Sequence, residues 1–169
     1  APEVIFTGEA PEPHADFGVT RALNEVEYGA PARAAPVLTA EANALSALQN
    51  AGYANASAGE RRVIVDHATG RVTARYSLNP GPITRLGTVS AQPNDLFRPS
   101  FIERLQNWET GDRYSPQALQ QLRRDLTSTG AVSLATTRLE PPGADGISNV
   151  VIDVEPARRN AYELGLSYS

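Results

Sequence analysis

Hydrophobic residues in the second half of the chain follow two different spacings. An apolar run at residues 83–91 is typical of a strand, and two further runs at 131–139 and 150–155 have the same character. Between them, apolar residues recur every three or four positions, as on one face of a helix. The helical positions are Phe101, Ile102, Leu105 and Trp108, then Leu119, Leu122 and Leu126. The pattern predicts a β-α-α-β-β order.

Local signals set the ends of the two predicted helices. Ser100 with Glu103 three residues later forms a capping box, so a helix is predicted at 100–108. Ser115 followed by Pro116 at the first helical position predicts the start of a second helix at 115–129, which Gly130 ends.

The packing of the second helix follows from its period. Leu122 and Leu126 lie on the face that is expected to meet a sheet. We expect both to be buried against Val132, Leu134, Ile152 or Val154, which the strand pattern supplies.

The first half of the chain contains a similar set of elements. Residues 3–7 read as a strand before a Pro-rich turn, and residues 17–20 resume a strand-like pattern. A helix is predicted at 39–51, with Thr39 as its cap and Gly52 as its stop. Two strands follow, at 61–66 and 71–78.

Matching the two halves indicates an internal repeat. Pro13 and Pro82 are 69 residues apart, whereas Gly52 and Gly130 are 78 apart. A near-constant offset is typical of a repeat. The difference of nine residues predicts that the first copy is shorter, with a loop or single turn at residues 24–36 in place of its first helix.

Composition and charge narrow the class of protein. The chain has 169 residues, of which 41% are hydrophobic and 20% charged, as in an ordinary globular protein. Its net charge of −4 and the lack of a basic stripe argue against nucleic acid as a partner. With no cysteine there is neither a disulfide framework nor a thiolate metal site. Because the chain does not begin with Met, we expect it to be part of a longer protein.

Candidate catalytic residues are few. The two histidines lie apart, His14 in a Pro-rich turn and His67 beside Asp66 at a hairpin, and neither has a second histidine one helical turn away. Asp16 and Asp95 have no partner carboxylate in the pattern. We therefore expect no enzymatic activity, no cofactor and no metal.

Short motifs in both copies resemble those of POTRA domains, the polypeptide-transport-associated modules. Each copy has a helix that ends in Gly before a strand, in Asn-Ala-Gly-Tyr at 50–53 and Ser-Thr-Gly-Ala-Val at 128–132. An Asn-Pro-Gly-Pro linker at 79–82 and a Glu-Thr-Gly-Asp-Arg-Tyr-Ser segment at 109–115 complete the likeness. The order and spacing of these motifs, more than any one of them, resemble the outer-membrane assembly superfamily that includes BamA and TamA.

The resemblance implies an α+β chain of two tandem POTRA domains, each with a three-stranded mixed sheet and helices on one face, the first domain with a shortened first helix. The implied boundaries are residues 1–11 for the last strand of a preceding POTRA domain, 12–80 and 81–157 for the two domains, and 158–169 for the start of a transmembrane β-barrel strand. The last segment alternates, with Tyr162, Leu164, Leu166 and Tyr168 on one face.

The function that the resemblance implies is that of a periplasmic arm tethered to the bacterial outer membrane. A TamA-like protein would dock unfolded outer-membrane protein clients, or a TamB-like partner anchored at the inner membrane, and pass clients to its own C-terminal β-barrel. The alternatives are the POTRA arm of a BamA-like protein or a two-partner secretion (TpsB) transporter, and a cell-division scaffold.

The resemblance also implies where binding takes place. The second strand of a POTRA sheet lies at an edge, where unpaired backbone groups accept a passing strand. The candidate docking residues are Arg61, Arg62, Val63, Ile64 and Val65 in the first copy and Val132, Ser133, Leu134, Ala135 and Thr136 in the second. Pro80, Gly81 and Pro82 form the candidate hinge between domains.

Overall fold

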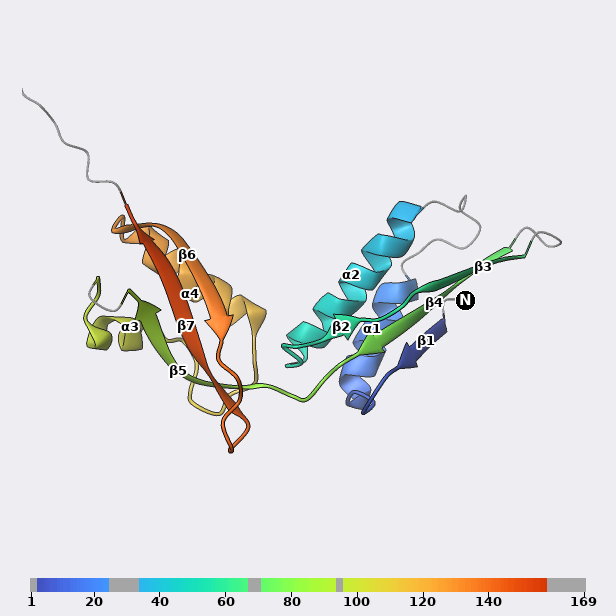
Figure 1. Ribbon diagram of the computed structural model, residues 1–169, viewed down its shortest axis with the longest axis horizontal. Helices are drawn as coiled ribbons and strands as arrows, with labels where there is room; N and C mark the ends of the chain where they lie inside the picture. The colour runs from blue at the N-terminus through green and yellow to red at the C-terminus, as the bar shows by residue number, and fades with distance from the viewer. Residues whose placement is uncertain (1–2, 25–33, 67–70, 94–95, 158–169) are drawn as a thin grey trace, which may run out of the picture.

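The computed structural model describes residues 3–24, 34–66, 71–93 and 96–157. These residues form four α-helices and seven β-strands, arranged as two α+β units joined by an extended segment (Figure 1). No helix within these ranges is long and apolar enough to cross a membrane.

The first unit is built around its last strand. This strand, β4, lies between β1, which is parallel to it, and β2 and β3, which are antiparallel. Helices α1 and α2 pack side by side on one face of the sheet (Figure 1). The bounds are β1 Glu3–Phe6, α1 Pro13–Asn24, α2 Ala34–Asn50, β2 Ser57–Ala58, β3 Arg62–Asp66 and β4 Arg71–Asn79.

The second unit repeats this connectivity. Its last strand, β7, again lies in the middle, with β5 parallel on one side and β6 antiparallel on the other. The bounds are β5 Arg85–Gln92, α3 Pro99–Leu105, α4 Pro116–Ser128, β6 Val132–Leu139 and β7 Ile147–Pro156. The predicted α+β class and the tandem β-α-α-β-β order are confirmed.

The prediction of a shortened first helix in the first unit is wrong. Helix α1 has 12 residues whereas its counterpart α3 has seven, and α1 includes the residues at 17–20 that were expected to be a strand. The error came from pairing Gly18, which is helical, with Gly87, which lies in β5. In fact β1 and β5 end at Phe6 and Gln92, each seven residues before the start of its helix. Of the predicted loop at 24–36, residues 25–33 lie outside the described residues.

The strand near the N-terminus also has a different place from the one expected. It was assigned to a preceding domain within residues 1–11, but β1 pairs in parallel with β4, from Glu3 opposite Arg75 to Phe6 opposite Leu78. It is thus the first strand of the first unit, equivalent to β5 beside β7. A parallel pair needs a long crossover, and α1 and α2 supply it.

Helix starts were predicted with mixed success. Ser115 caps α4 as expected, since its hydroxyl accepts a hydrogen bond from the Ala118 amide at 3.3 Å and Pro116 follows it. Ser100 does not cap α3; the N-cap is Arg98, whose side chain makes no capping bond, and Pro99 occupies the first helical turn. Proline has a backbone suited to that position and lacks only an N–H that the helix would leave unpaired.

The end of α2 is closed by a glycine, as predicted. Gly52 has φ of 102°, a left-handed conformation in which a side chain is strained. The Gly52 amide donates to the Gln49 carbonyl at 3.0 Å and the Tyr53 amide donates to the Leu48 carbonyl at 3.1 Å. This pair of bonds is the Schellman motif, which satisfies the last free carbonyls of a helix.

Each unit has its own hydrophobic core. In the second unit Leu122 and Leu126 are fully buried, as expected, in a cluster with Val132, Ile152 and Val154. Trp108 also belongs to it although α3 ends before it, and its indole N–H donates to the Gly87 carbonyl at 2.8 Å. The core of the first unit is formed by residues of α1, α2 and the sheet, with Val19, Leu23, Leu48, Tyr76 and Leu78 most deeply buried.

Leu134 is the exception to the predicted core. Its side chain is 51% exposed, while Val132 and Ala135 are buried. The register of β6 against β7 shifts between Val132 and Leu134, where one extra residue is inserted. A shift of one residue turns every later side chain to the opposite face. Leu134 therefore faces away from the helices, contrary to simple alternation.

We predict that Leu122→Ala lowers the free energy of unfolding by about 2–5 kcal/mol, because it removes buried methyl groups and leaves a cavity. Leu134→Ala removes the same atoms from a half-exposed site and should change it by no more than about 0.5 kcal/mol. Urea unfolding monitored by circular dichroism measures both. Equal effects of the two substitutions would contradict the packing described.

Candidate functional site: sheet edges and the junction between the units

Strand β3 is an edge strand that exposes apolar side chains on both faces. It pairs only with β4, so the backbone groups on its other side have no strand partner among the described residues. Val63, opposite Ala74, points to the helix side and is 48% exposed; Ile64, opposite Thr73, points to the other side and is 46% exposed. An added strand would cover both side chains.

The two arginines near this edge differ in whether their side chains are held by another residue. The Arg61 guanidinium bonds the Glu41 carboxylate of α2 at 3.0 Å, so it is held toward the helix. Arg62, the first residue of β3, is exposed. The register against β4 shifts by one residue between β2 and β3, which places an irregularity at residues 59–61. The edge is therefore regular from Arg62 to Asp66.

Strand β6 is the matching edge of the second unit, and its surface is more polar. Val132 and Ala135 face the core, and of the outward side chains only Leu134 is a large apolar one. The Ser133 hydroxyl, at the bulge, donates to the Glu155 carbonyl at 3.3 Å. A bulge at the start of an edge strand disfavours pairing with another strand there.

Arg138 of β6 lies across the open face of this sheet. Its guanidinium donates to the Asp153 carboxylate of β7 at 3.1 Å and to the Gln92 side chain of β5 at 3.2 Å, thus joining all three strands. Val151 is paired with Arg138 in register and is only 1% exposed although it lies outside the helix-covered core. The apolar stem of Arg138 explains this burial.

The opposite edges of the two sheets are either partly occupied, as on β5, or short, as on β1. The first half of β5 is covered by the loop before α4: the Leu86 amide donates to the Asp112 carbonyl and the Gly111 amide to the Leu86 carbonyl, both at 2.8 Å. On β1, which has four residues, the Glu3 carboxylate pairs with Arg75 of β4 at 2.8 Å. The longer free edges are thus β3 and β6.

The structure shows where the residues that were predicted to dock a partner strand lie in the two sheets. Both predicted stretches lie on edge strands of the described sheets, apart from Arg61, which directly precedes β3. Docking itself stays a prediction. Val132 and Ala135 are buried in the core and can contribute only backbone groups to it.

The predicted hinge lies against the first unit, and the residues that follow it connect to the second. Pro80 is fully buried, and the Gly81 amide donates to the Asn79 side chain at 3.1 Å. Ile83 packs against the core of the first unit. Thr84 then bridges the units through its backbone: its amide donates to the Gly52 carbonyl and its carbonyl accepts from the Tyr114 amide, both at 2.9 Å.

Side chains strengthen this junction. The two terminal guanidinium nitrogens of Arg113 in the second unit, Nη1 and Nη2, donate to the Glu12 carboxylate of the first, each at 2.9 Å. Next to it, the Gln117 amide of α4 donates to the Asn50 side chain of α2 at 2.8 Å. The hydrogen bonds from Arg113 lower the pKa of Glu12 below its ordinary value of 4.5. A two-pronged Arg–carboxylate contact fixes orientation as well as distance.

Sequence reasoning missed this junction. Arg113 was noted only as part of a motif, and its partner Glu12 is 101 residues away. A pairing over such a separation leaves no signal in periodicity or local spacing. Two tyrosines were missed too, the buried Tyr76 and the partly buried Tyr114, and in both burial raises the pKa. Among the described residues, no group of three His, Cys, Asp or Glu side chains is placed to hold a metal ion.

We predict that Arg113→Gln raises the pKa of Glu12 toward 4.5. Since the folded pKa is lowered, the pair stabilises the junction at pH above 4.5, and this stabilisation is lost as the pH falls through the lower folded value. The titration of the Glu12 carboxyl carbon by NMR measures the change. Arg138→Gln, which removes another half-exposed ion pair, is the control and should leave Glu12 unchanged. Identical Glu12 titrations in the parent and in Arg113→Gln would refute the contact.

No protein-family model matches the chain, and no curated protein matches its sequence. Solved structures do share its fold. Haemophilus influenzae BamA POTRA3–5 has a TM-score of 0.75 at 16% identity, over 91% of this chain and 59% of that one. BamA from Haemophilus ducreyi lacking POTRA domains 1–3 has a TM-score of 0.72 at 16% identity, over 91% of this chain and 29% of that one.

A third solved structure has nearly the length of this chain. POTRA1–2 of the periplasmic domain of Omp85 from Anabaena has a TM-score of 0.56 at 12% identity, over 89% of this chain and 92% of that one. The chain thus spans less than two thirds of either BamA fragment. At these identities the likeness concerns the fold, and it confirms that the chain folds as two successive POTRA domains.

Proposed function

We propose that this chain is the periplasmic POTRA arm of an outer-membrane protein of the Omp85 superfamily, and that it binds polypeptides by strand addition. The fold supports the superfamily, because the solved structures that resemble it are POTRA domains of BamA and Omp85. In the full-length protein the arm is tethered to the outer membrane and hands clients to a C-terminal β-barrel. The segment at 158–169, expected to begin that barrel, lies outside the described residues.

The observation that carries the binding mode is the free edge of β3. A row of unpaired backbone N–H and C=O groups can pair with an extended chain, whatever its sequence. Unfolded outer-membrane proteins are rich in sequences that form strands, so such an edge suits them as a client class. The contact would be made chiefly by the backbone, and side chains would adjust it.

We prefer β3 to β6 because an added strand would bury more apolar surface there. Val63 and Ile64 are both about half exposed and lie on opposite faces of the sheet. Side chains of a strand added beside β3 would therefore cover Val63 on one face and Ile64 on the other. On β6 only Leu134 offers similar area, and the bulge at Ser133 interrupts the edge. Burial of apolar area contributes roughly 25 cal/mol per Å².

Within the superfamily we propose a TamA-like protein whose second partner is an inner-membrane-anchored protein of the TamB type. Since β1 belongs to the first unit, residues 1–11 are not the last strand of a preceding domain, and the proposal is supported by the tandem POTRA fold alone. A BamA-like arm is the alternative that the fold of the BamA fragments favours. Sequencing of the gene on both sides of this chain separates the two by the number of POTRA domains.

We predict that proline at Val63 or at Ile64, whichever has its N–H directed outward, impairs assembly of client proteins in the outer membrane. Proline removes a hydrogen-bond donor and cannot take part in a ladder. Alanine at the same position keeps the donor and should weaken binding little. Client levels in isolated outer membranes measure the effect in cells that carry the full-length protein.

Matched changes on the second edge act as controls. Proline at Leu134 or Thr136 tests whether β6 is used instead, and circular dichroism of each purified variant confirms that it folds. Normal client assembly with proline at every outward position of both edges, in folded variants, would exclude strand addition as the mechanism.

A further inference from the structure

Helix α1 carries an aromatic side chain on its most exposed side. Phe17 is 70% exposed, and it lies opposite the buried stripe of the helix. That stripe consists of Ala15, Val19, Ala22 and Leu23. Phe17 therefore adds nothing to the core, and its ring remains in contact with water.

The fold does not require an apolar residue at this place. Helix α3 is the counterpart of α1 in the second unit, and its exposed residues include Glu103 and Arg104. The two helices also differ in their packing, since α1 lies along α2 whereas α3 packs mainly on β5. The close packing of the two helices against each other is thus a feature of the first unit.

The groove between these two helices, the α1–α2 groove, is lined by small residues and bordered by Phe17. One hollow of about 300 Å³ extends from His14 and Gly18 on α1 to Ala47 on α2 and Ala51 just after its end. A neighbouring hollow of about 400 Å³ continues along α1 and is lined by Phe17, Thr20, Arg21 and Asn24. At the floor, a Cβ atom on Gly18 would lie 3.5 Å from the Ala47 Cβ, which is an ordinary contact.

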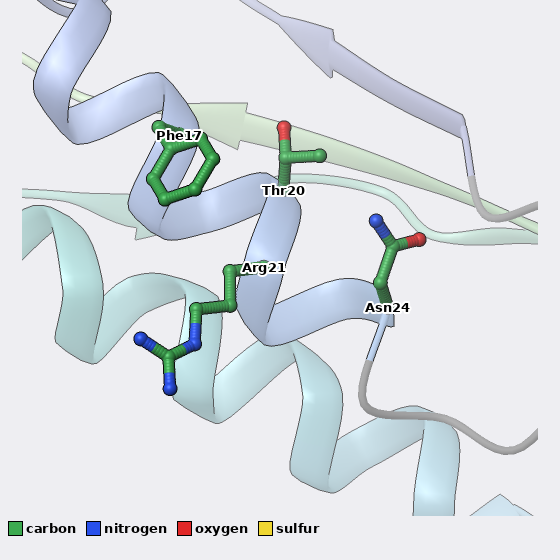
Figure 2. Close-up of a pocket in the computed structure, with 4 residues that line it drawn as sticks. All are labelled: Phe17, Thr20, Arg21 and Asn24. Carbon is green, nitrogen blue, oxygen red and sulfur yellow. The ribbon is translucent and has the colours of Figure 1, made fainter.

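Arg21 gives the α1–α2 groove a positive wall. It is exposed, one turn after Phe17, and it borders both hollows. Figure 2 shows its side chain extended from α1 toward α2, with Phe17 on the same helix above it. No carboxylate in the described part of the chain forms an ion pair with Arg21, and the nearby Glu12 is held by Arg113. Among the described residues that line the two hollows there is no Asp or Glu.

We propose that the α1–α2 groove binds an extended segment of a partner polypeptide in which an apolar side chain stands next to a carboxylate. The apolar group would pack on Phe17 and on the small-residue floor formed by Gly18 and Ala47. The carboxylate would accept hydrogen bonds from Arg21, whose planar guanidinium suits that geometry. This site is separate from the β3 edge, and its partner would be bound through side chains and not through the backbone. It therefore goes beyond the proposed strand addition.

The probe is a capped peptide of Gly and Ser with one central Asp-Phe pair, titrated into the ¹⁵N-labelled chain and followed by NMR. Saturable shifts of the His14, Phe17, Gly18, Arg21 and Ala47 amides are expected. Peptides with Asn-Phe or Asp-Ser in place of Asp-Phe test the two features separately, and both should bind more weakly.

Substitutions in the α1–α2 groove test the same contacts by changing the protein instead of the peptide. Phe17→Ser should weaken binding of the Asp-Phe peptide about tenfold, because it removes the aromatic surface. Arg21→Gln should weaken peptide binding about two- to fivefold, as expected for an exposed ion pair. Arg21→Lys keeps the positive charge and should weaken binding less. Gly18→Leu should block the groove, and Gly18→Ala is its control, since the added methyl group fits.

Three results would overturn the proposal. The first is equal binding of the Asn-Phe and Asp-Phe peptides, or equal affinity of Arg21→Gln and the parent. The second is a pattern of shifts on β3 with none in the α1–α2 groove. The third concerns vesicles of phosphatidylethanolamine and phosphatidylglycerol. If the parent chain sediments with them, Phe17→Ser does not, and the parent binds no peptide, this surface binds lipid.

Discussion

The last strand of each unit lies in the middle of its sheet, and most other features of the molecule follow from this placement. In β4 and β7 both sides are paired, so the remaining strands of each sheet are edges. The first strand is parallel to the last, which requires a crossover, and the two helices of the crossover cover one face. The helices bury that face, so each unit closes its core and leaves free backbone only at the edges.

The two edges of each sheet differ in how much free backbone they offer to another strand. On β5, residues 111–113 already occupy part of the edge, and β1 offers only a short edge of four residues. In each unit one residue is inserted beside the second strand, just before β3 and at the start of β6, and a regular stretch follows. The repetition of this irregularity in both units indicates that it belongs to the architecture. It confines strand addition to the regular part of the edge.

The order of the elements in the second unit could be predicted from the sequence because strand and helix periods differ. Ser115, Gly52 and Gly130 mark helix ends by local chemistry, and their roles were predicted correctly. The predicted docking strands also proved to be edge strands. The errors arose where one residue changes the pattern. Aligning Gly18 with Gly87 turned a helix into a strand, and the bulge near Leu134 reversed the face that alternation assigned to it.

The junction could not be predicted, because its parts are far apart in sequence and each is common by itself. The Glu12–Arg113 pair is half exposed, and such pairs contribute little to stability. Its importance is geometric, since it acts together with the Gln117–Asn50 bond and the backbone bond from Thr84 to Gly52.

The packing of Ile83 on the first core makes the linker part of the first unit rather than a free tether. Rotation about Pro80–Pro82 alone would therefore have to break the Thr84 and Arg113 contacts together. A polypeptide paired with β3 would then lie at a set angle to the second unit.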